Sequence, residues 1–352
     1  MYNLLVKSEN LIALKYLLDN RKMGGKVDLV YIDPPFATGN SFTRTDDRNS
    51  TISYSREGVI AYSDKLNGKE YIKFLRERLI LLRDLLSERG SIYLHIDYKV
   101  GHYVKVMMDE VFGIENFRND IARIKCNPKN FKRIGFGNVK DLVLFYTKSP
   151  NPIWNEPMMA YSDNDMDRLF PKTDASGRRY TTVPIHAPGE TVSGASNMPF
   201  RGMLPPRGRH WRTNVKTLEK WDMEGLIEWS STGNPRKKIY ADEKDGKRVQ
   251  DIWEFKDPQY PCYPTEKNED MLDLIIRTSS DYDSIVLDCF CGSGTTLKAA
   301  QMNGRRWIGI DQSEYAINAT LDKLTSTPSC LFSSNTDYKL IDLDETQIDQ
   351  AI

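Results

Sequence analysis

The mostly apolar segment Val27–Ile32 runs directly into Asp33, Pro34, Pro35 and Phe36, and this junction constrains the fold more than any other feature. A short β-branched run closed by two prolines predicts a buried parallel strand that ends in a turn. In open α/β sheets the carboxyl ends of the strands face the ligand crevice. We therefore expect a carboxylate, two rigid prolines and an aromatic ring at a binding site.

The segment 283–288 is a second predicted strand, which ends in Asp288 and leads into a turn carrying Gly292 and Gly294. A strand, a glycine turn and a helix in series are typical of a nucleotide-type site, because glycine lets the backbone approach a ligand closely. The free N–H groups at the start of the helix can bind a carboxylate. The alternative role for Asp288 is a cap within the turn.

A third predicted strand, 307–311, ends in Asp311. This acid follows Asp288 by about 20 residues, the distance that suits a pair of ribose hydroxyls. Its alternative role is the N-cap of the next helix. A dinucleotide-binding turn would carry a third glycine at the position of Leu297. The turn therefore favours a ligand with a ribose and a carboxylate but no pyrophosphate, such as S-adenosylmethionine.

Strand and helix patterns alternate before about residue 150 and after about residue 255, which argues for a parallel α/β sheet. Apolar residues at helical spacing predict a helix over about 71–86 that Gly90 stops, followed by a strand over 91–96. The two strands that end in Asp33 and Asp288 are expected side by side at the switch point of a doubly wound sheet. Their two sites would then meet across one crevice.

The 352 residues carry 49 basic and 49 acidic side chains, a balance that disfavours a wholly basic nucleic-acid binder. Basic residues nevertheless concentrate in 118–148 and 201–220, and local patches can bind phosphates on a neutral protein. In the first of these stretches the candidate DNA contacts are Lys129, Lys132 and Arg133.

Between about 150 and 255 the regular patterns weaken, and proline, glycine and arginine punctuate the chain. Arg207, Arg209 and Arg212 are candidate DNA contacts here, because guanidinium groups bind phosphate or read guanine edges. The same stretch holds five of the six tryptophans, most of which we expect in a small core of this region.

Several features exclude other classes of protein. The chain has no 18-residue apolar run that could span a membrane, and its first residues lack the layout of a signal peptide. Its five cysteines are scattered, as expected for reduced thiols in the cytoplasm. Neither the cysteines nor the four histidines show metal-ligand spacing, so we expect no metal site.

The segments that follow the first two predicted strands resemble the paired motifs of amino-group DNA methyltransferases. Residues 33–36 resemble the catalytic motif, and residues 290–294 resemble the methyl-donor motif. The catalytic half comes first, as in the permuted β class of adenine-N6 and cytosine-N4 enzymes. Several ordered motifs are far more specific than one. Further segments that resemble this class are 6–11, 95–97, 108–117, 141–148 and 263–267.

Two positions depart from the usual pattern of that class. Asn268 stands where the family usually has proline, and Phe36 stands where tyrosine is commoner. The second change removes a hydroxyl but keeps a ring face for stacking.

The resemblance implies an α/β fold with a doubly wound, mostly parallel sheet, which is the circularly permuted form of the S-adenosylmethionine-dependent methyltransferase fold with an inserted target-recognition region. It implies a catalytic half at 1–149, the target-recognition region at 150–255, a donor half at 256–325 and an acidic tail at 326–352.

The resemblance also implies roles for single residues. Asp33 and the Pro34 carbonyl would accept N–H groups of the target amine, while Pro35 and Phe36 shape its pocket. The donor candidates are Glu9, Thr265, Lys267, Asp288, Phe290, Gly292, Gly294, Thr295 and Asp311.

The implied activity is methylation of the N6 amino group of a flipped adenine in double-stranded DNA. The implied setting is a prokaryotic restriction–modification system or a solitary methylase, located in the cytoplasm on the nucleoid. A cognate restriction endonuclease and a second copy of the chain are the expected partners. Three alternatives stay open: cytosine-N4 methylation, methylation of RNA or protein glutamine, and a DNA-binding protein that has lost catalysis. Asp33 favours adenine, because the cytosine class usually has serine before the two prolines.

Overall fold

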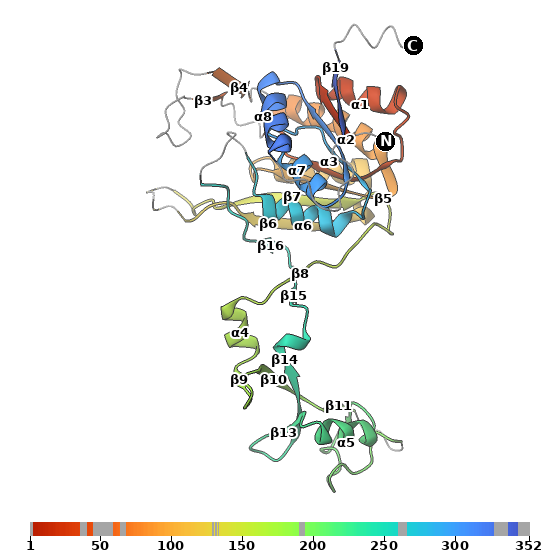
Figure 1. The fold of residues 1–352 in the computed structure, drawn as a ribbon, viewed down its shortest axis with the longest axis vertical. Coiled ribbons are helices and arrows are strands. Elements are labelled where there is room, and N and C mark those ends of the chain that lie inside the picture. Colours follow the sequence, from red (N-terminus) through yellow and green to blue (C-terminus); the bar gives the residue numbers. More distant parts are fainter. Residues whose placement is uncertain are drawn as a thin grey trace. The chain divides into compact units, whose positions relative to one another are not determined.

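The computed structural model describes residues 3–35, 41–44, 59–63, 68–128, 130, 132, 134–189, 194–259, 266–326 and 337–343, with the backbone alone for 41–44 and 59–63. The chain divides into two compact units (Figure 1). The first unit comprises Met1–Pro157 and Gln250–Ile352, and the second comprises Met158–Val249. The second unit lies inside the range 150–255 that the sequence sets apart.

In the described residues, the first unit is built on a nine-stranded sheet (Figure 1). Neighbouring strands are parallel except where β7 pairs with β5 and β6. In spatial order the strands are β16 (Ile252–Trp253), β6 (Phe117–Ile124), β7 (Lys140–Thr147), β5 (Leu86–Ile96), β2 (Val27–Ile32), β17 (Ile285–Asp288), β18 (Arg306–Asp311), β1 (Asn3–Lys7) and β19 (Tyr338–Asp342).

The strands β2 and β17 are neighbours in this sheet, with Leu29 opposite Val286 and Val30 opposite Leu287. From β2 the sheet continues on one side to β5, and from β17 it continues on the other side to β18. The switch point of the doubly wound sheet therefore lies between these two strands. This confirms the predicted arrangement, in which Asp33 and Asp288 stand at adjacent strand ends.

Two rows of helices cover the sheet (Figure 1). In one row α2 packs between α1 and α3, and in the other α7 packs between α6 and α8. The helices are α1 (Asn10–Asp19), α2 (Gly68–Leu85), α3 (Gly101–Phe112), α6 (Glu269–Ser279), α7 (Thr295–Met302) and α8 (Glu314–Thr325), with the 3-10 turn η1 (Ile114–Asn116) after α3. Among the described residues, no helix is both long and apolar enough to cross a membrane.

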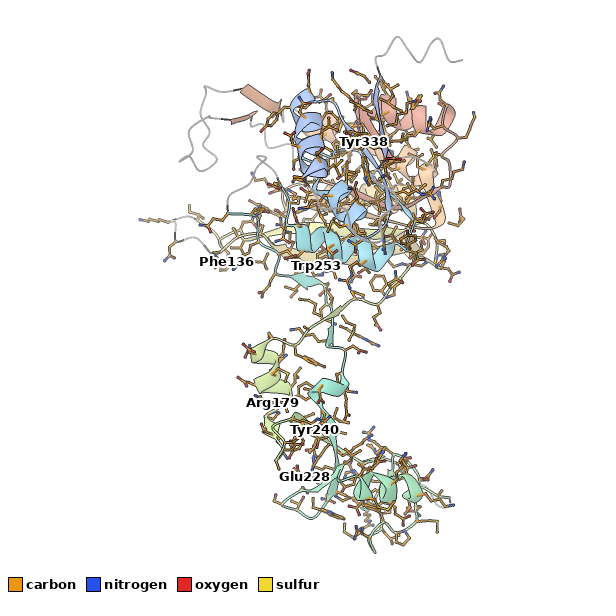
Figure 2. The ribbon with its side chains drawn as sticks, in the orientation of Figure 1. Phe136, Arg179, Glu228, Tyr240, Trp253 and Tyr338 are labelled. Carbon is orange, nitrogen blue, oxygen red and sulfur yellow. The ribbon has the colours of Figure 1, made fainter. Side chains whose placement is uncertain are left out.

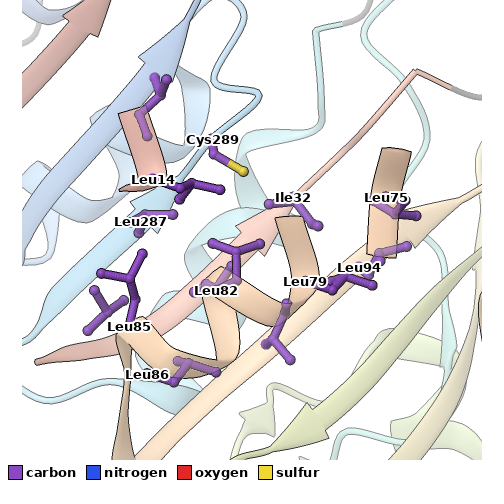
Figure 3. Close-up of a cluster of buried hydrophobic side chains, with 14 of the residues drawn as sticks. Leu14, Ile32, Leu75, Leu79, Leu82, Leu85, Leu86, Leu94, Leu287 and Cys289 are labelled. Carbon is purple, nitrogen blue, oxygen red and sulfur yellow. The ribbon is translucent and has the colours of Figure 1, made fainter. Parts of the chain in front are cut away.

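The core beneath α2 shows why this segment is helical. Leu75, Leu79 and Leu82 recur at helical spacing and are completely buried. They pack toward Ile32 of β2 and Leu94 of β5 (Figure 3). Burying one leucine contributes about 1.5–3 kcal/mol, so this stripe fixes α2 on the two strands that approach the site.

The predicted stop of this helix at Gly90 is wrong, because α2 ends at Leu85 and β5 begins at Leu86. Gly90 lies inside the strand, at an irregular pairing with β2. A Cβ on Gly90 would meet the Val27 carbonyl oxygen at 3.0 Å. The glycine thus allows close approach of two backbones, a common reason for glycine within a strand.

The second unit contains shorter elements. Its four-stranded antiparallel sheet has the order β13-β14-β10-β9, and Arg179, Glu228 and Tyr240 (Figure 2) come from β10, β13 and β14. Its elements are β8 (Met158–Met159), α4 (Asp163–Leu169), β9 (Lys172–Thr173), β10 (Arg179–Pro184), β11 (His186–Pro188), β12 (Arg209–Trp211), α5 (Val215–Met223), β13 (Ile227–Trp229), β14 (Pro235–Tyr240), η2 (Ala241–Glu243) and β15 (Lys247–Arg248). A separate antiparallel pair, β3 (Ser41–Arg44) with β4 (Val59–Ser63), belongs to the first unit.

The expectation of a shared tryptophan core is wrong for Trp154 and Trp253, which belong to the first unit. Trp211 is fully buried in the second unit, where its ring meets Phe200 edge-on. Trp229 stacks on the same Phe200 ring but stays 42% exposed. How deeply each tryptophan ring is buried depends on where its segment lies in the fold. The clustering of the tryptophans in the sequence does not reveal this.

Candidate active site

Asp33 directly follows β2, and its side chain is only 15% exposed. Its Oδ2 lies 2.7 Å from the ammonium of Lys267. Its Oδ1 is buried and has no hydrogen-bond partner among the described residues. Buried carboxylate oxygens are normally paired, so an open one at a strand end is suited to accept an N–H group from a ligand.

The two prolines follow Asp33 as expected, with Pro34 buried and Pro35 half-buried. A prolyl carbonyl remains a hydrogen-bond acceptor although its nitrogen has no proton. Phe36, the fourth residue of the motif, lies outside the described residues.

A completely buried histidine, His95 of β5, lies behind Asp33 with its Nδ1 3.9 Å from Asp33 Oδ1. Its Nδ1 is 3.1 Å from the Tyr31 hydroxyl and its Nε2 is 3.4 Å from Asp141 Oδ2. Burial lowers the pKa of His95 below its ordinary value, although the hydrogen bond to Asp141 opposes this shift. His95 is therefore a neutral imidazole near pH 7.

The charge on Asp141 fixes the tautomer of His95. Burial raises the pKa of Asp141, but its hydrogen bonds to His95 and Lys125 and the positive charge of Lys125 outweigh burial and hold that pKa well below its usual range. A carboxylate can only accept, so Nε2 of His95 carries the proton and Nδ1 accepts from Tyr31. This proton arrangement is inferred from the hydrogen-bond partners.

The buried charges continue from Asp141 to the edge of the sheet. Lys125 lies 2.6 Å from Asp141, and completely buried Arg123 donates to the Phe255 carbonyl at 2.8 Å and to Asp257 at 2.5 Å. Buried ions need such partners, because removing one partner leaves an uncompensated charge. The network joins β6 and β7 to the chain that follows β16.

Asp288 ends β17, and its Oδ1 accepts the backbone N–H of Phe290 at 3.0 Å. Burial raises the pKa of Asp288 to about 7, and the charges of Asp33 and Asp311 act in the same direction. The Asp288 side chain therefore caps the turn, which is the alternative role that the sequence allowed. It is also partly protonated near neutral pH.

Asp311 ends β18 and accepts two backbone N–H groups, from Gly292 at 3.0 Å and from Ser313 at 2.9 Å. The N-cap of α8 is Ser313, so the alternative role of Asp311 as that cap is wrong. Burial raises the pKa of Asp311 although these backbone bonds oppose the shift. Each carboxylate oxygen has spare acceptor capacity, which suits a pair of hydroxyls.

Both glycines of the turn adopt a backbone conformation that favours glycine. Gly292 and Gly294 both have positive φ, at 51° and 75°. A Cβ on Gly294 would lie 2.7 Å from a Thr320 methyl, so packing against α8 accounts for this glycine. Gly294 precedes α7 and gives it no side-chain cap, which suits a bound carboxylate.

Aromatic and polar side chains also surround the glycine turn. The Phe290 ring is partly buried beside Phe74, with ring centroids 6.3 Å apart. Thr295 is buried and its Oγ1 accepts from Lys323 at 2.8 Å. An apolar ring, an acid and uncapped helical N–H groups together suit a ligand with an adenosine and a carboxylate, so the residues fit S-adenosylmethionine.

Of the other donor candidates, Glu9 and Lys267 contact groups outside this turn. Glu9 caps α1 by accepting the Leu11 N–H at 2.8 Å, and its other oxygen pairs with Arg78. Lys267 contacts Asp33, the catalytic candidate. Thr265 lies outside the described residues.

The DNA candidates of the second unit gather at the β11–β12 ribbon. Arg207, Arg209 and Arg212 are all exposed there. Arg209 lies 3.1 Å from Nδ1 of His186, and Arg212 donates to the His186 carbonyl at 3.3 Å. Burial, and then the charges of Arg209, Arg212 and Arg236, lower the pKa of His186. The ribbon is therefore electropositive.

The remaining DNA candidates lie in the first unit. Lys132 is exposed, whereas Lys129 and Arg133 lie outside the described residues. Within the described part of the chain, no three His, Cys, Asp or Glu side chains are grouped to hold a metal ion.

Sequence reasoning missed the network of polar and charged side chains behind Asp33, namely buried His95, Asp141 and Arg123 with half-buried Lys125. A charged residue inside an otherwise apolar strand segment is the signal that could have found them, because such residues are almost never buried unpaired. It also missed Glu266 and Lys323, whose contact joins residues 57 positions apart.

Comparison with known proteins gives a family match over most of the chain. The family model described as DNA methylase matches residues 27–322. The Type II methyltransferase M.EcaI of Enterobacter cloacae is 40% identical over 327 residues, which cover 91% of this chain and 69% of that protein. The probable type III restriction-modification enzyme HindVI Mod subunit of Haemophilus influenzae is 25% identical over 398 residues.

The HindVI alignment covers 92% of this chain and 50% of that subunit, so the chain spans about half of its length. Among solved structures, the M1.HpyAVI–SAM complex is similar with a TM-score of 0.49 and 16% identity. That alignment covers 91% of this chain and 98% of the other.

The family model covers well over half of the sequence, and the similarity to M.EcaI extends over most of both proteins. As the resemblance implied, the chain belongs to the N6/N4 family of DNA methylases.

Proposed function

We propose that this chain transfers a methyl group from S-adenosylmethionine to the N6 amino group of adenine in double-stranded DNA. The observation that carries this proposal is the open Oδ1 of Asp33, which stands at the strand end next to Asp288 and the glycine turn. An acceptor for an amine is thus adjacent to a turn that fits the methyl donor.

The amino group of adenine is hidden within a duplex, so the base has to be flipped out of the stack. Flipping costs a few kcal/mol. In this proposal the ring of Phe36 offsets part of that cost by stacking, a role that rests on the sequence motif. The buried Pro34 and half-buried Pro35 give the pocket a rigid wall.

Asp33 Oδ1 and the Pro34 carbonyl oxygen would accept the two N–H groups of the amine. This arrangement favours a more tetrahedral nitrogen and makes its lone pair available for attack. When bound, S-adenosylmethionine would supply the electrophilic methyl group. Asp33 Oδ1 then takes the proton that the nitrogen releases, and because Lys267 occupies Oδ2, one defined oxygen does this. Positioning supplies much of the rate.

The donor would be held by groups on the two strands beyond β2. Asp311 would bind the ribose hydroxyls, and the start of α7 after Gly294 would bind the carboxylate. Phe290 would contact the adenine or the cationic sulfonium. Asp288 and Gly292 shape the turn, and Glu9 caps α1.

We further propose that the second unit is the target-recognition region. Its support is the exposed arginine group on the β11–β12 ribbon, formed by Arg207, Arg209 and Arg212. Lys132 of the first unit would add a phosphate contact. By analogy with the restriction–modification relatives, a cognate endonuclease and a second copy of the chain are the partners to look for.

Single-molecule sequencing of DNA from a methylation-deficient host that expresses the chain tests the proposal. We expect N6-methyladenine at one short motif, and none with Asp33→Ala. N4-methylcytosine would keep the fold and mechanism but overturn the choice of base. If no modified base appears, double-stranded DNA is not the substrate of this chain by itself.

A further inference from the structure

Two adjacent residues of opposite charge, Glu266 and Lys267, contact two different parts of the site. The Lys267 ammonium lies 2.7 Å from Asp33 Oδ2, at the catalytic strand end. The Glu266 carboxylate pairs with Lys323 of α8. One peptide unit therefore separates a contact to the catalytic residue from a contact to the donor half.

Lys323 connects Glu266 to the donor turn. Its ammonium also donates to Ser293 Oγ at 3.1 Å and to Thr295 Oγ1 at 2.8 Å. Both hydroxyls flank Gly294, where the turn enters α7. A shift of the turn would thus move Lys323 and, through it, Glu266.

These ion pairs are shielded from water. The side chains of Lys323 and Glu266 are 12% and 10% exposed, and those of Lys267 and Asp33 are 13% and 15% exposed. Charges at such depth interact more strongly than surface pairs, and losing one partner is costly. The contacts can therefore carry a geometric constraint.

The backbone after the pair is anchored as well. Asn268 caps α6 by accepting the Met271 N–H at 3.0 Å, and its amide donates to the Lys256 carbonyl at 3.0 Å. Asparagine at this position, where the resemblance predicts proline, thus provides two hydrogen bonds. Glu266 and Lys267 consequently start from a fixed point and cannot relax independently.

We propose that Glu266 and Lys267 form a charge clasp that couples the donor turn to the orientation of Asp33. Both are positioning residues, and Lys267 acts on Asp33 rather than on the donor. The clasp holds Oδ2 so that Oδ1 faces the target amine when the turn is in its binding geometry. This inference rests on the proposed methyl transfer and adds to it a coupling between the two halves of the site.

The test measures donor binding and the chemical step separately in the full chain. Calorimetry gives the Kd for S-adenosylmethionine, and single-turnover methylation at saturating donor and DNA gives the rate. For Lys267→Met we expect the rate to fall by about 100-fold, the cost of a small misplacement. The donor Kd should stay within about threefold of the wild type, far less than the change in rate.

Two further variants probe the coupling. Lys267→Arg keeps the cation and should recover part of the lost rate, which also guards against misfolding of the methionine variant. Glu266→Gln touches neither substrate, yet it should lower the saturated rate. The double variant Glu266→Gln/Lys267→Met should be little slower than Lys267→Met alone, because coupled residues are not additive.

Lys298→Met is the matched control. The side chain of Lys298 in α7 pairs with Glu269 of α6 at 2.7 Å and takes part in neither the Lys267–Asp33 nor the Glu266–Lys323 ion pair. It should behave as the wild type. A higher donor Kd with an unchanged saturated rate in Lys267→Met, or full additivity in the double variant, would overturn the clasp. A wild-type chain that methylates neither adenine nor cytosine would instead overturn the proposed function.

Discussion

The two units of this protein use charge in opposite ways. In the first unit the functional candidates are carboxylates at strand ends that are buried or nearly so, as for Asp33 and Asp288. In the second unit the candidates are exposed cations, Arg207, Arg209 and Arg212. A buried charge has strong, directional partners, whereas an exposed charge is screened by water and salt. Single substitutions should therefore have large effects in the first unit and small effects in the second.

The architecture of each unit matches its use of charge. The first unit has a continuous sheet whose core holds α1, α2 and α3 against the central strands. The second unit has a small core around Trp211 and several strands of two or three residues. A rigid sheet can hold reacting groups in place, and short strands with long connections can present a DNA-reading surface.

The largest effect is expected for Asp33→Ala. Loss of the carboxylate that would accept one N–H group of the amine and take its proton should lower the single-turnover rate by about 10²–10⁴-fold. The donor Kd should hardly change, because the donor groups lie on other strands. Calorimetry and methyl incorporation measure the two quantities. The exposed Asp19→Ala serves as the control, and substantial remaining activity in Asp33→Ala would remove Asp33 from the mechanism.

The next effect concerns stability. In the folded chain the pKa of Asp288 is about 7, against an ordinary value of 3.8. The unfolded chain loses this proton first, so stability should fall as pH rises from about 4 to 7. Asp288→Asn keeps an acceptor for Phe290 but cannot ionise, and at pH 8 it should be more stable by roughly 2–4 kcal/mol.

Urea unfolding of Asp288→Asn and the wild type across this pH range measures that difference. The exposed Asp19→Asn should leave the pH profile unchanged. A constant offset between Asp288→Asn and the wild type at all pH values would show that Asp288 is ionised equally in both states.

A smaller effect is expected at the donor site. Asp311→Ala removes a carboxylate that would bind two hydroxyls, and charged hydrogen bonds are worth about 1.5–3 kcal/mol, so the donor Kd should rise about 10–100-fold. Calorimetry with S-adenosylmethionine measures this change. Unchanged affinity in a variant that still folds would exclude the ribose role.

The smallest effect is expected in the second unit. Arg209→Ala should weaken DNA binding about tenfold or less and reduce the slope of log affinity against log salt by about 1. Fluorescence anisotropy over a salt series measures both quantities. Arg178 is the matched control, because Asp242 and Glu243 already neutralise its charge. A large, salt-independent loss of DNA affinity in Arg209→Ala would contradict the expected difference between the two units.

Local pattern allowed much of the fold to be predicted. The strand before Asp33, the glycine turn after Asp288 and the strand before Asp311 all lie where the sequence placed them. Proline, glycine and apolar spacing act within a few residues, so they can be read without a structure. The role of Gly90 as a helix stop was predicted wrongly, because that glycine serves a contact with β2, which no local pattern reveals.

The sequence by itself determined which residues stand at the ends of the strands, and the order of the motifs predicted the two halves of the site. Only the tertiary structure decided how the charges are paired. His95 meets Asp141 across 46 residues, and Arg123 meets Asp257 across 134. The partner of Lys267 is Asp33, although the sequence assigned that lysine to the donor. Such pairs depend on the register of strands far apart in the chain, and their strength depends on burial, so neither property is present in the local sequence.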